Sequence, residues 1–162
     1  MFGISPLGWV HALGSLPALP LALTLLFRHG RIDPRSGLGK AYGGFMVLGA
    51  ATVFPLAHSS TSVGLATATL VLLALGFSVG RIAALGRAAA YIETIALSLT
   101  VFLLLVPTVT EVLRRVPEGH PIAPDLGSPI LKSAHLALVV GLVIGLIAQL
   151  RALKRQRTAA PR

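Results

Sequence analysis

Histidine has the clearest chemical potential in this chain, because neutral imidazole nitrogens bind metal ions and haem iron. His11 begins the first apolar run, His58 ends the second and His135 begins the fifth. Since consecutive membrane spans alternate in direction, these three positions lie at similar depth on one side of a membrane. His120 lies in the loop on that side, and Glu111 ends the fourth run near the same level. The pattern predicts a cofactor site at this face.

Two types of cofactor and one simpler interpretation fit these histidines. In the first, two of His11, His58 and His135 are the axial ligands of one haem b. The cations expected to meet its propionates are Arg114, Arg115 and Lys132. In the second, zinc, copper or iron is bound by the set His11, His58, His120, His135 and Glu111. In the third, the histidines carry no ligand, because water at the membrane interface solvates them.

Two glutamates of the fourth run suggest the transfer of a proton or an ion. Glu93 and Glu111 are about five helical turns apart and therefore point the same way. Ionisable groups inside a membrane are costly and often functional. A simpler interpretation is favoured, in which Glu93 reaches Arg87 or water near the end of the span. Glu111 would then pair with Arg115, four residues later.

Other kinds of chemistry are excluded or have no motif. The chain has no cysteine, which excludes disulfides, thiolate metal sites and cysteine nucleophiles. No HExxH motif occurs, and no catalytic residue is predicted. A net charge of +9 suits nucleic acid only on a folded basic surface, whereas these charges lie between apolar runs. No nucleic-acid partner is expected.

Five apolar runs predict an all-α, integral membrane bundle. Hydrophobic residues make up 54% of the 162 and charged residues 12%, with a mean hydropathy of +0.83, which is too apolar for a soluble domain. The expected spans are approximately residues 7–27, 41–57, 63–79, 91–112 and 130–150. Pro17 and Pro20 are expected to bend the first span. Residues 1–155 would form one domain, followed by a basic cytoplasmic tail at 156–162.

The loop from Phe27 to Lys40 determines the expected orientation. Short loops rich in Lys and Arg stay on the cytoplasmic side, so this loop places the N-terminus outside and the C-terminus inside. Only Arg114, Arg115 and Lys132 then lie outside. The cations inside are Arg28, Arg31, Arg35, Lys40, Arg81, Arg87, Arg151, Lys154, Arg155, Arg157 and Arg162. The expected location is the inner membrane of a bacterium.

Small residues are expected at the contacts between spans, because close backbone approach drives helix packing in lipid. These residues are Gly14, Ala18, Ala22, Gly76, Gly80, Gly141 and Gly145. The GxxxG spacings among them indicate a compact bundle, and they allow a homo-oligomer or assembly into a larger membrane complex.

Three elements resemble a family of small, uncharacterised multi-span bacterial membrane proteins. They are His11-x-x-Gly14 opening the first span, Gly30-Arg31 after it, and Leu38-Gly39-Lys40-Ala41-Tyr42 opening the second. The family's second element usually reads His-Arg-x-x-Gly-Arg-x-Tyr, and Arg35 stands here in place of its histidine. The resemblance implies a multi-span architecture in a bacterial inner membrane and carries no activity.

Three functions follow as hypotheses from these observations. The first is a membrane redox protein that holds haem b or a metal ion through the outer histidines and exchanges electrons with a quinone or an outer partner. The second is a non-catalytic accessory or assembly subunit of a larger membrane complex. The third is a small proton-coupled transporter, which requires the stripe between Glu93 and Glu111 to face a cavity.

Overall fold

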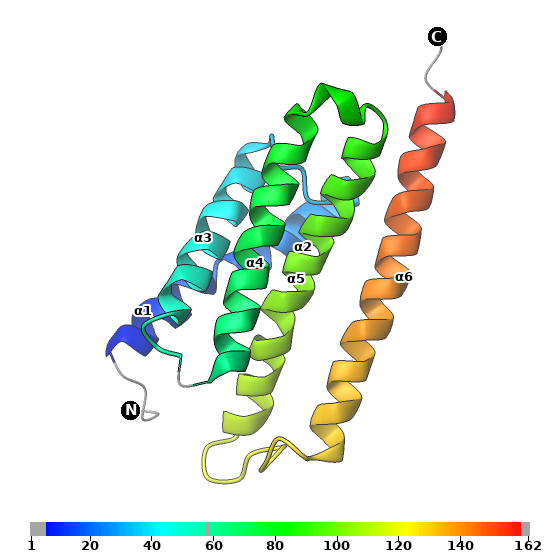
Figure 1. Cartoon of the computed structure of the whole chain (residues 1–162). Helices are drawn as coiled ribbons and strands as arrows, with labels where there is room; N and C mark the ends of the chain where they lie inside the picture. The colour runs from blue at the N-terminus through cyan, green and yellow to red at the C-terminus, as the bar shows by residue number, and fades with distance from the viewer. Residues whose placement is uncertain (1–5, 58, 160–162) are drawn as a thin grey trace. The chain divides into compact units, whose positions relative to one another are not determined.

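The computed structural model describes residues 6–57 and 59–159 of the chain. Every regular element in these residues is a helix, and none of them lies in a strand (Figure 1). The α-helices are α1 (Pro6–Ser15), α2 (Ala18–His29), α3 (Gly37–Val53), α4 (Ser60–Ser78), α5 (Ala88–Arg115) and α6 (Pro129–Ala159). Two short 3-10 helices, η1 (Val79–Arg81) and η2 (Ala83–Leu85), connect α4 to α5. The predicted all-α fold is confirmed.

Four helical segments are long and apolar enough to cross a membrane. They are Pro6–His29, Ser60–Arg81, Ala88–Arg115 and Pro129–Gln156, with 24, 22, 28 and 28 residues. These segments coincide with four of the five predicted spans. Their length and composition are those of a membrane protein. α3 has 17 residues, against the about 17 needed at minimum to cross the hydrocarbon core. The fifth crossing therefore stays a prediction.

The first apolar segment consists of two helices, where a single helix bent at its prolines was expected. α1 ends at Ser15 and α2 begins at Ala18, with Leu16 and Pro17 between them. Pro17 has φ −63° and precedes the first residue of α2, a position where its missing N–H costs no helical hydrogen bond. Pro20 lies within the first turn of α2, where the backbone N–H is also unused by the helix.

α3 begins at Gly37, four residues before the expected start of the span at Ala41. Ser36 accounts for the difference, because its Oγ accepts a hydrogen bond from the backbone N–H of Gly39 at 2.9 Å. Serine in this position satisfies one of the N–H groups that the first turn of a helix leaves unpaired. The basic loop between α2 and α3 is accordingly shorter than the sequence suggests.

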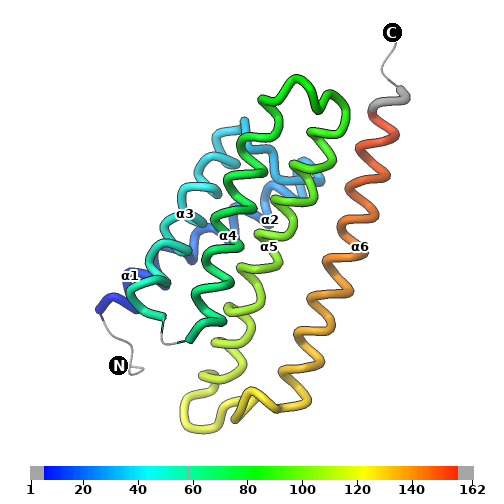
Figure 2. The backbone as a smooth tube through the Cα atoms, in the orientation of Figure 1, coloured from blue at the N-terminus to red at the C-terminus, as the bar shows by residue number. Residues whose placement is uncertain are grey.

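The chain divides into two compact units, Met1–Thr100 and Val101–Arg162, and α5 runs from the first into the second. In the first unit α3 packs against α1, α2 and α4. α3 and α4 lie side by side and run in opposite directions (Figures 1 and 2). The loop after α2 and the η1–η2 connection are consequently at the same end of this unit.

Small residues make the close contacts of the first unit, as expected. A Cβ added to Gly14 would lie 2.9 Å from Leu48, and one added to Gly76 would lie 2.6 Å from Leu97. Ala18 and Ala22 are fully buried. Gly141 and Gly145 of α6 do not make such contacts. A Cβ added to either glycine would have none of the described neighbouring residues within 4 Å.

The second unit consists of the end of α5, a folded connection and α6. The connection turns back on α5, with the N–H of Ala123 donating to the carbonyl of Leu113 at 2.9 Å. The N–H of Gly127 donates to Asp125 Oδ1 at 2.7 Å, just before α6 begins. The prolines of this segment therefore lie in an ordered connection that sets the start of α6.

Candidate functional site

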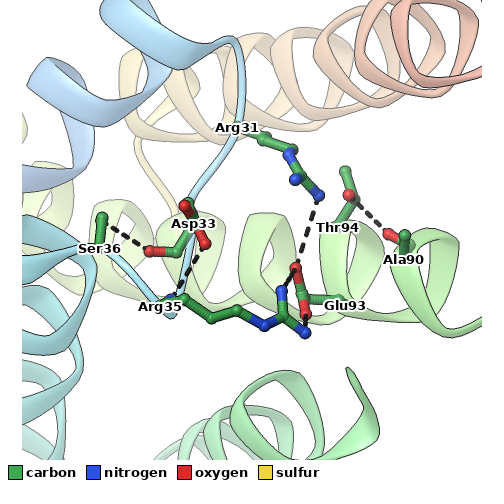
Figure 3. Close-up of polar contacts among 7 residues, drawn as sticks. All are labelled: Arg31, Asp33, Arg35, Ser36, Ala90, Glu93 and Thr94. Carbon is green, nitrogen blue, oxygen red and sulfur yellow. Dashed lines mark hydrogen bonds and ion pairs between the residues drawn. The ribbon is translucent and has the colours of Figure 1, made fainter. Parts of the chain in front are cut away.

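A buried carboxylate with two arginine partners lies in the first unit. Glu93 lies in the second turn of α5 and is 1% exposed. Arg35 approaches both carboxylate oxygens, with Nη2 3.1 Å from Oε2 and Nη1 3.5 Å from Oε1. Arg31 places Nη1 3.5 Å from Oε1 (Figure 3). These three residues are called the Glu93 cluster below.

The loop after α2 directs both arginines to Glu93. Gly30 ends α2 with φ +69°, a conformation that glycine adopts without steric cost. Ile32 is 1% exposed and Pro34 is also buried, so the loop is anchored by the two side chains that alternate with the arginines. The two buried side chains thus hold the backbone that carries both arginines.

Hydrogen bonds within the loop hold the backbone at Arg35. Asp33 Oδ1 accepts from the N–H of Arg35 at 3.0 Å, and the Asp33 carbonyl accepts from Ser36 Oγ at 2.8 Å (Figure 3). Gly39 lies so close to the Asp33 carbonyl that a Cβ there would overlap it. The single acid of this loop thus orders the backbone, whereas Glu93 supplies the charge that pairs with the arginines.

Gly80 of η1 provides the space in which the Glu93 cluster forms. A Cβ at this position would overlap the guanidinium of Arg35 and lie 2.9 Å from Glu93 Oε2. The sequence pattern assigned Gly80 to helix packing, and its neighbours here are the charged groups of the cluster. A larger residue would force the end of the Arg35 side chain to move.

Arg31 and Arg35 supply the partners that a buried carboxylate needs, because a buried charge without a partner is strongly disfavoured. These ion pairs connect α5 to the loop after α2, so the geometry supports a structural role for Glu93, which is one end of the predicted stripe. Glu111, at the other end of the stripe, forms the predicted ion pair with Arg115.

His11 of α1 is hydrogen-bonded to α3 through one ring nitrogen. Nδ1 lies 2.9 Å from Thr52 Oγ1 and 3.1 Å from the carbonyl of Gly49. The Thr52 hydroxyl donates to the Leu48 or the Gly49 carbonyl, at 2.8 and 2.9 Å, so it accepts from the imidazole. Both partners of Nδ1 are acceptors, which places the hydrogen on Nδ1. In the neutral ring Nε2 then carries the lone pair.

His135 of α6 shows the same arrangement in the second unit. Its Nε2 lies 2.9 Å from Thr110 Oγ1 of α5, and the Thr110 hydroxyl donates to the Val106 carbonyl at 2.7 Å. The hydroxyl is therefore an acceptor from the ring, and Nε2 carries the hydrogen. Nδ1 of the neutral ring has the lone pair.

The remaining predicted ligands are not gathered around these histidines in the described part of the chain. His58 lies outside the described residues. His120 is exposed in the connection after α5, where its backbone N–H bonds to the Pro117 carbonyl, and Arg114 is exposed at the end of α5. Within residues 6–57 and 59–159 no three His, Asp or Glu side chains form a group that could hold a metal ion.

The sequence analysis missed the arginine partners of Glu93 and the threonine partners of the histidines. One signal was present for the first: Glu93 and Asp33 are the only acids among the first hundred residues. Both acids lie at span ends that carry the basic residues. Ion pairs between an acid of one loop and an arginine of another could therefore have been expected. Thr52 and Thr110 gave no signal, because their role depends on which helix faces them.

An all-α chain with four helices able to cross a membrane and with charges collected at helix ends defines the class of helical membrane proteins. Comparisons with protein families, with curated proteins and with solved structures give no match for this chain.

Proposed function

We propose that this chain is a small redox protein of the bacterial cytoplasmic membrane, in which His11 and His58 bind haem b or a metal ion at the outer face. The electron partner would be a quinone or a protein on the outer side. The observation that carries the proposal is the hydrogen bonding of His11, whose Nδ1 has two acceptors on α3, so that Nε2 has the lone pair in the neutral ring.

Histidine ligands in proteins usually donate their second ring N–H to a carbonyl or a similar acceptor, which orients the ring and raises its basicity. His11 has this arrangement, with the Gly49 carbonyl and the Thr52 hydroxyl as its acceptors. His58 is another of the predicted ligands and follows Thr52 by six positions in the sequence, and we propose it as the second ligand. A bound haem b or copper ion would carry one electron at a time.

The proposed orientation has its support in the charge distribution of the first unit. Every charged residue before position 100 lies between Arg28 and Lys40 or between Arg81 and Glu93. These segments are the ends of α2 and α4 and the starts of α3 and α5, which share one end of the unit. Basic helix ends stay in the cytoplasm, so His11 would be outside. The proposal includes five spans, with α3 as the second.

The direct test is the visible absorption spectrum and the metal content of the full chain, purified from membranes supplied with haem precursor. A Soret band or a stoichiometric metal ion is expected. His11→Ala and His58→Ala should each lower cofactor content about tenfold or more, because each removes a ligand. His29→Ala is the matched control, since His29 is exposed at the opposite end of the unit, and it should keep the cofactor.

Preparations with neither a Soret band nor a stoichiometric metal ion would overturn the proposal. Equal cofactor loss in His29→Ala would also overturn it, since the histidines would then act through folding alone. Either result favours an accessory subunit of a membrane complex, which co-purification with defined partners would identify.

A further inference from the structure

We propose that Arg31 and Arg35 form a binding site for the phosphate of an anionic phospholipid at the charged end of the first unit. The inference is independent of any cofactor at His11. It rests on the geometry, exposure and charge of the Glu93 cluster.

The exposure of the three side chains is strongly unequal. The Arg31 side chain is 30% exposed and that of Arg35 is 61% exposed, whereas the Glu93 side chain is 2% exposed. A molecule that approaches from solvent or from the headgroup layer therefore meets guanidinium groups and does not reach the carboxylate. Glu93 holds both guanidinium groups from the buried side of the cluster.

Both arginines keep donors for a further acceptor. Arg31 uses only Nη1 toward Glu93, and Arg35 uses Nη1 and Nη2. The Nε–H of each arginine and the Nη2 hydrogens of Arg31 have no acceptor among the described residues. Guanidinium groups bind phosphate oxygens through paired N–H donors, so two of them held by one carboxylate suit a phosphate group.

The charge of the cluster is positive, because one carboxylate neutralises only one of two guanidinium groups. Arg28, Lys40 and Arg81 are exposed at the same end of the unit and add to this charge. The anchored loop also fixes the arginines before a ligand arrives, which lowers the entropy lost on binding. An anion is therefore the chemical class that the site would take.

The position along the helices selects a lipid over a free anion. Glu93 lies in the second turn of a segment that is apolar enough to cross a membrane, so the guanidinium groups are at the level of lipid headgroups. Basic pockets between transmembrane helices on the cytoplasmic side bind the headgroups of anionic lipids. In the orientation proposed above, on which this step rests, the Glu93 cluster lies on that side, where the loop after α2 meets α5.

The test is a titration of the purified full chain in neutral detergent with phosphatidylglycerol, followed by native mass spectrometry. Bound phosphatidylglycerol is expected, with phosphatidylcholine binding weakly. Arg31→Gln and Arg35→Gln should each weaken phosphatidylglycerol binding about fivefold, because each removes charge-assisted hydrogen bonds to the phosphate. Arg28→Gln removes the same charge outside the cluster and should change binding less than about twofold, because salt screens an exposed charge that makes no direct contact with the phosphate.

A second variant separates specific binding from charge and from misfolding. Arg35→Gln combined with Glu93→Gln leaves the net charge unchanged and avoids an unpaired buried carboxylate. It should weaken phosphatidylglycerol binding about as much as Arg35→Gln alone. Unchanged binding in this double variant, or an equal loss in Arg28→Gln, would overturn the proposal. Inorganic phosphate that binds as tightly as phosphatidylglycerol would overturn the assignment to a lipid.

Discussion

Glu93 and its two arginine partners differ in their access to water, and this difference determines what each contributes to stability. Water can solvate the guanidinium groups when Glu93 is removed, because their side chains are 30% and 61% exposed. Glu93 is 1% exposed and has no such alternative when the arginines are removed. An unpaired buried charge costs far more than an unpaired surface charge.

Removal of both arginines should therefore destabilise the protein more than removal of the glutamate. We expect Arg31→Gln with Arg35→Gln to lower the free energy of unfolding by about 3 kcal/mol, and Glu93→Gln to lower it by about 1 kcal/mol or less. Thermal unfolding in neutral detergent would measure both. Glu111→Gln breaks an exposed pair and should have no measurable effect. Equal losses from the two sides of the cluster would contradict this explanation.

Thr52 should tune the cofactor affinity proposed for His11. Thr52→Val removes one of the two acceptors of the His11 Nδ1–H and keeps the shape of the side chain, so cofactor binding should weaken about tenfold. The ¹⁵N shifts of the His11 ring, measured without cofactor, should move toward a mixture of tautomers. Thr67→Val is the matched control, because the Thr67 hydroxyl also bonds within its own helix and is exposed. Similar effects from both substitutions would argue against a role for Thr52.

Two glycines of α3, Gly39 and Gly44, differ in the space around their Cα atoms. Gly39 faces the backbone carbonyl of Asp33, and an added Cβ would overlap that oxygen. Nothing lies within 4 Å of the same position at Gly44. The first contact is with backbone, which cannot rotate away as the end of a side chain can. Gly39 is therefore required by the loop that carries Arg35.

Alanine at the two positions should have opposite effects. Gly39→Ala is expected to lower the free energy of unfolding by about 2 kcal/mol or more, since the capped start of α3 must shift. Gly44→Ala should be neutral or stabilising by up to about 1 kcal/mol, because alanine favours the helix over glycine. Both values can be compared in one set of thermal unfolding curves. A neutral Gly39→Ala would show that the loop accommodates the methyl group.

The locations of the helices could be predicted from the sequence better than their boundaries. Apolar runs located all the segments that became α-helices, because burial in lipid requires long stretches without charge. The prolines predicted a bend in the first span, and the structure has a break at Leu16 and Pro17. The start of α3 was placed too late, because a serine cap extends a helix into polar sequence that hydropathy assigns to a loop. Local hydrogen bonds, rather than hydropathy, decide such boundaries.

The direction in which each histidine points could not be predicted from the sequence. Depth follows from the position of a residue in its span, so the assignment of His11 and His135 to one face of the membrane stays a prediction. The partner of each histidine depends on the rotation of its helix about its own axis, which small-residue contacts such as Gly49 against Ser15 decide. Packing of this kind leaves little trace in a single sequence.

For the whole molecule, the collection of charges at one end of the first unit has a measurable outcome. Fusions of green fluorescent protein or alkaline phosphatase report the inside and the outside of a bacterial membrane. Fusions after Arg35, Leu85 and Ala159 should be fluorescent, and fusions after Ala57 and His120 should have phosphatase activity. An external reporter after Arg35, or an even number of crossings, would remove the basis for placing His11 outside.

The shortness of α3 has a consequence for the surrounding bilayer. Its 17 residues extend about 26 Å, whereas a typical hydrocarbon core is about 30 Å thick. As the proposed second span, α3 would match thin membranes and would draw the adjacent leaflets inward in thick ones, at a modest cost for each ångström of mismatch. Acyl chain length is therefore a physical variable to which this protein should respond, with shorter chains favouring the folded bundle.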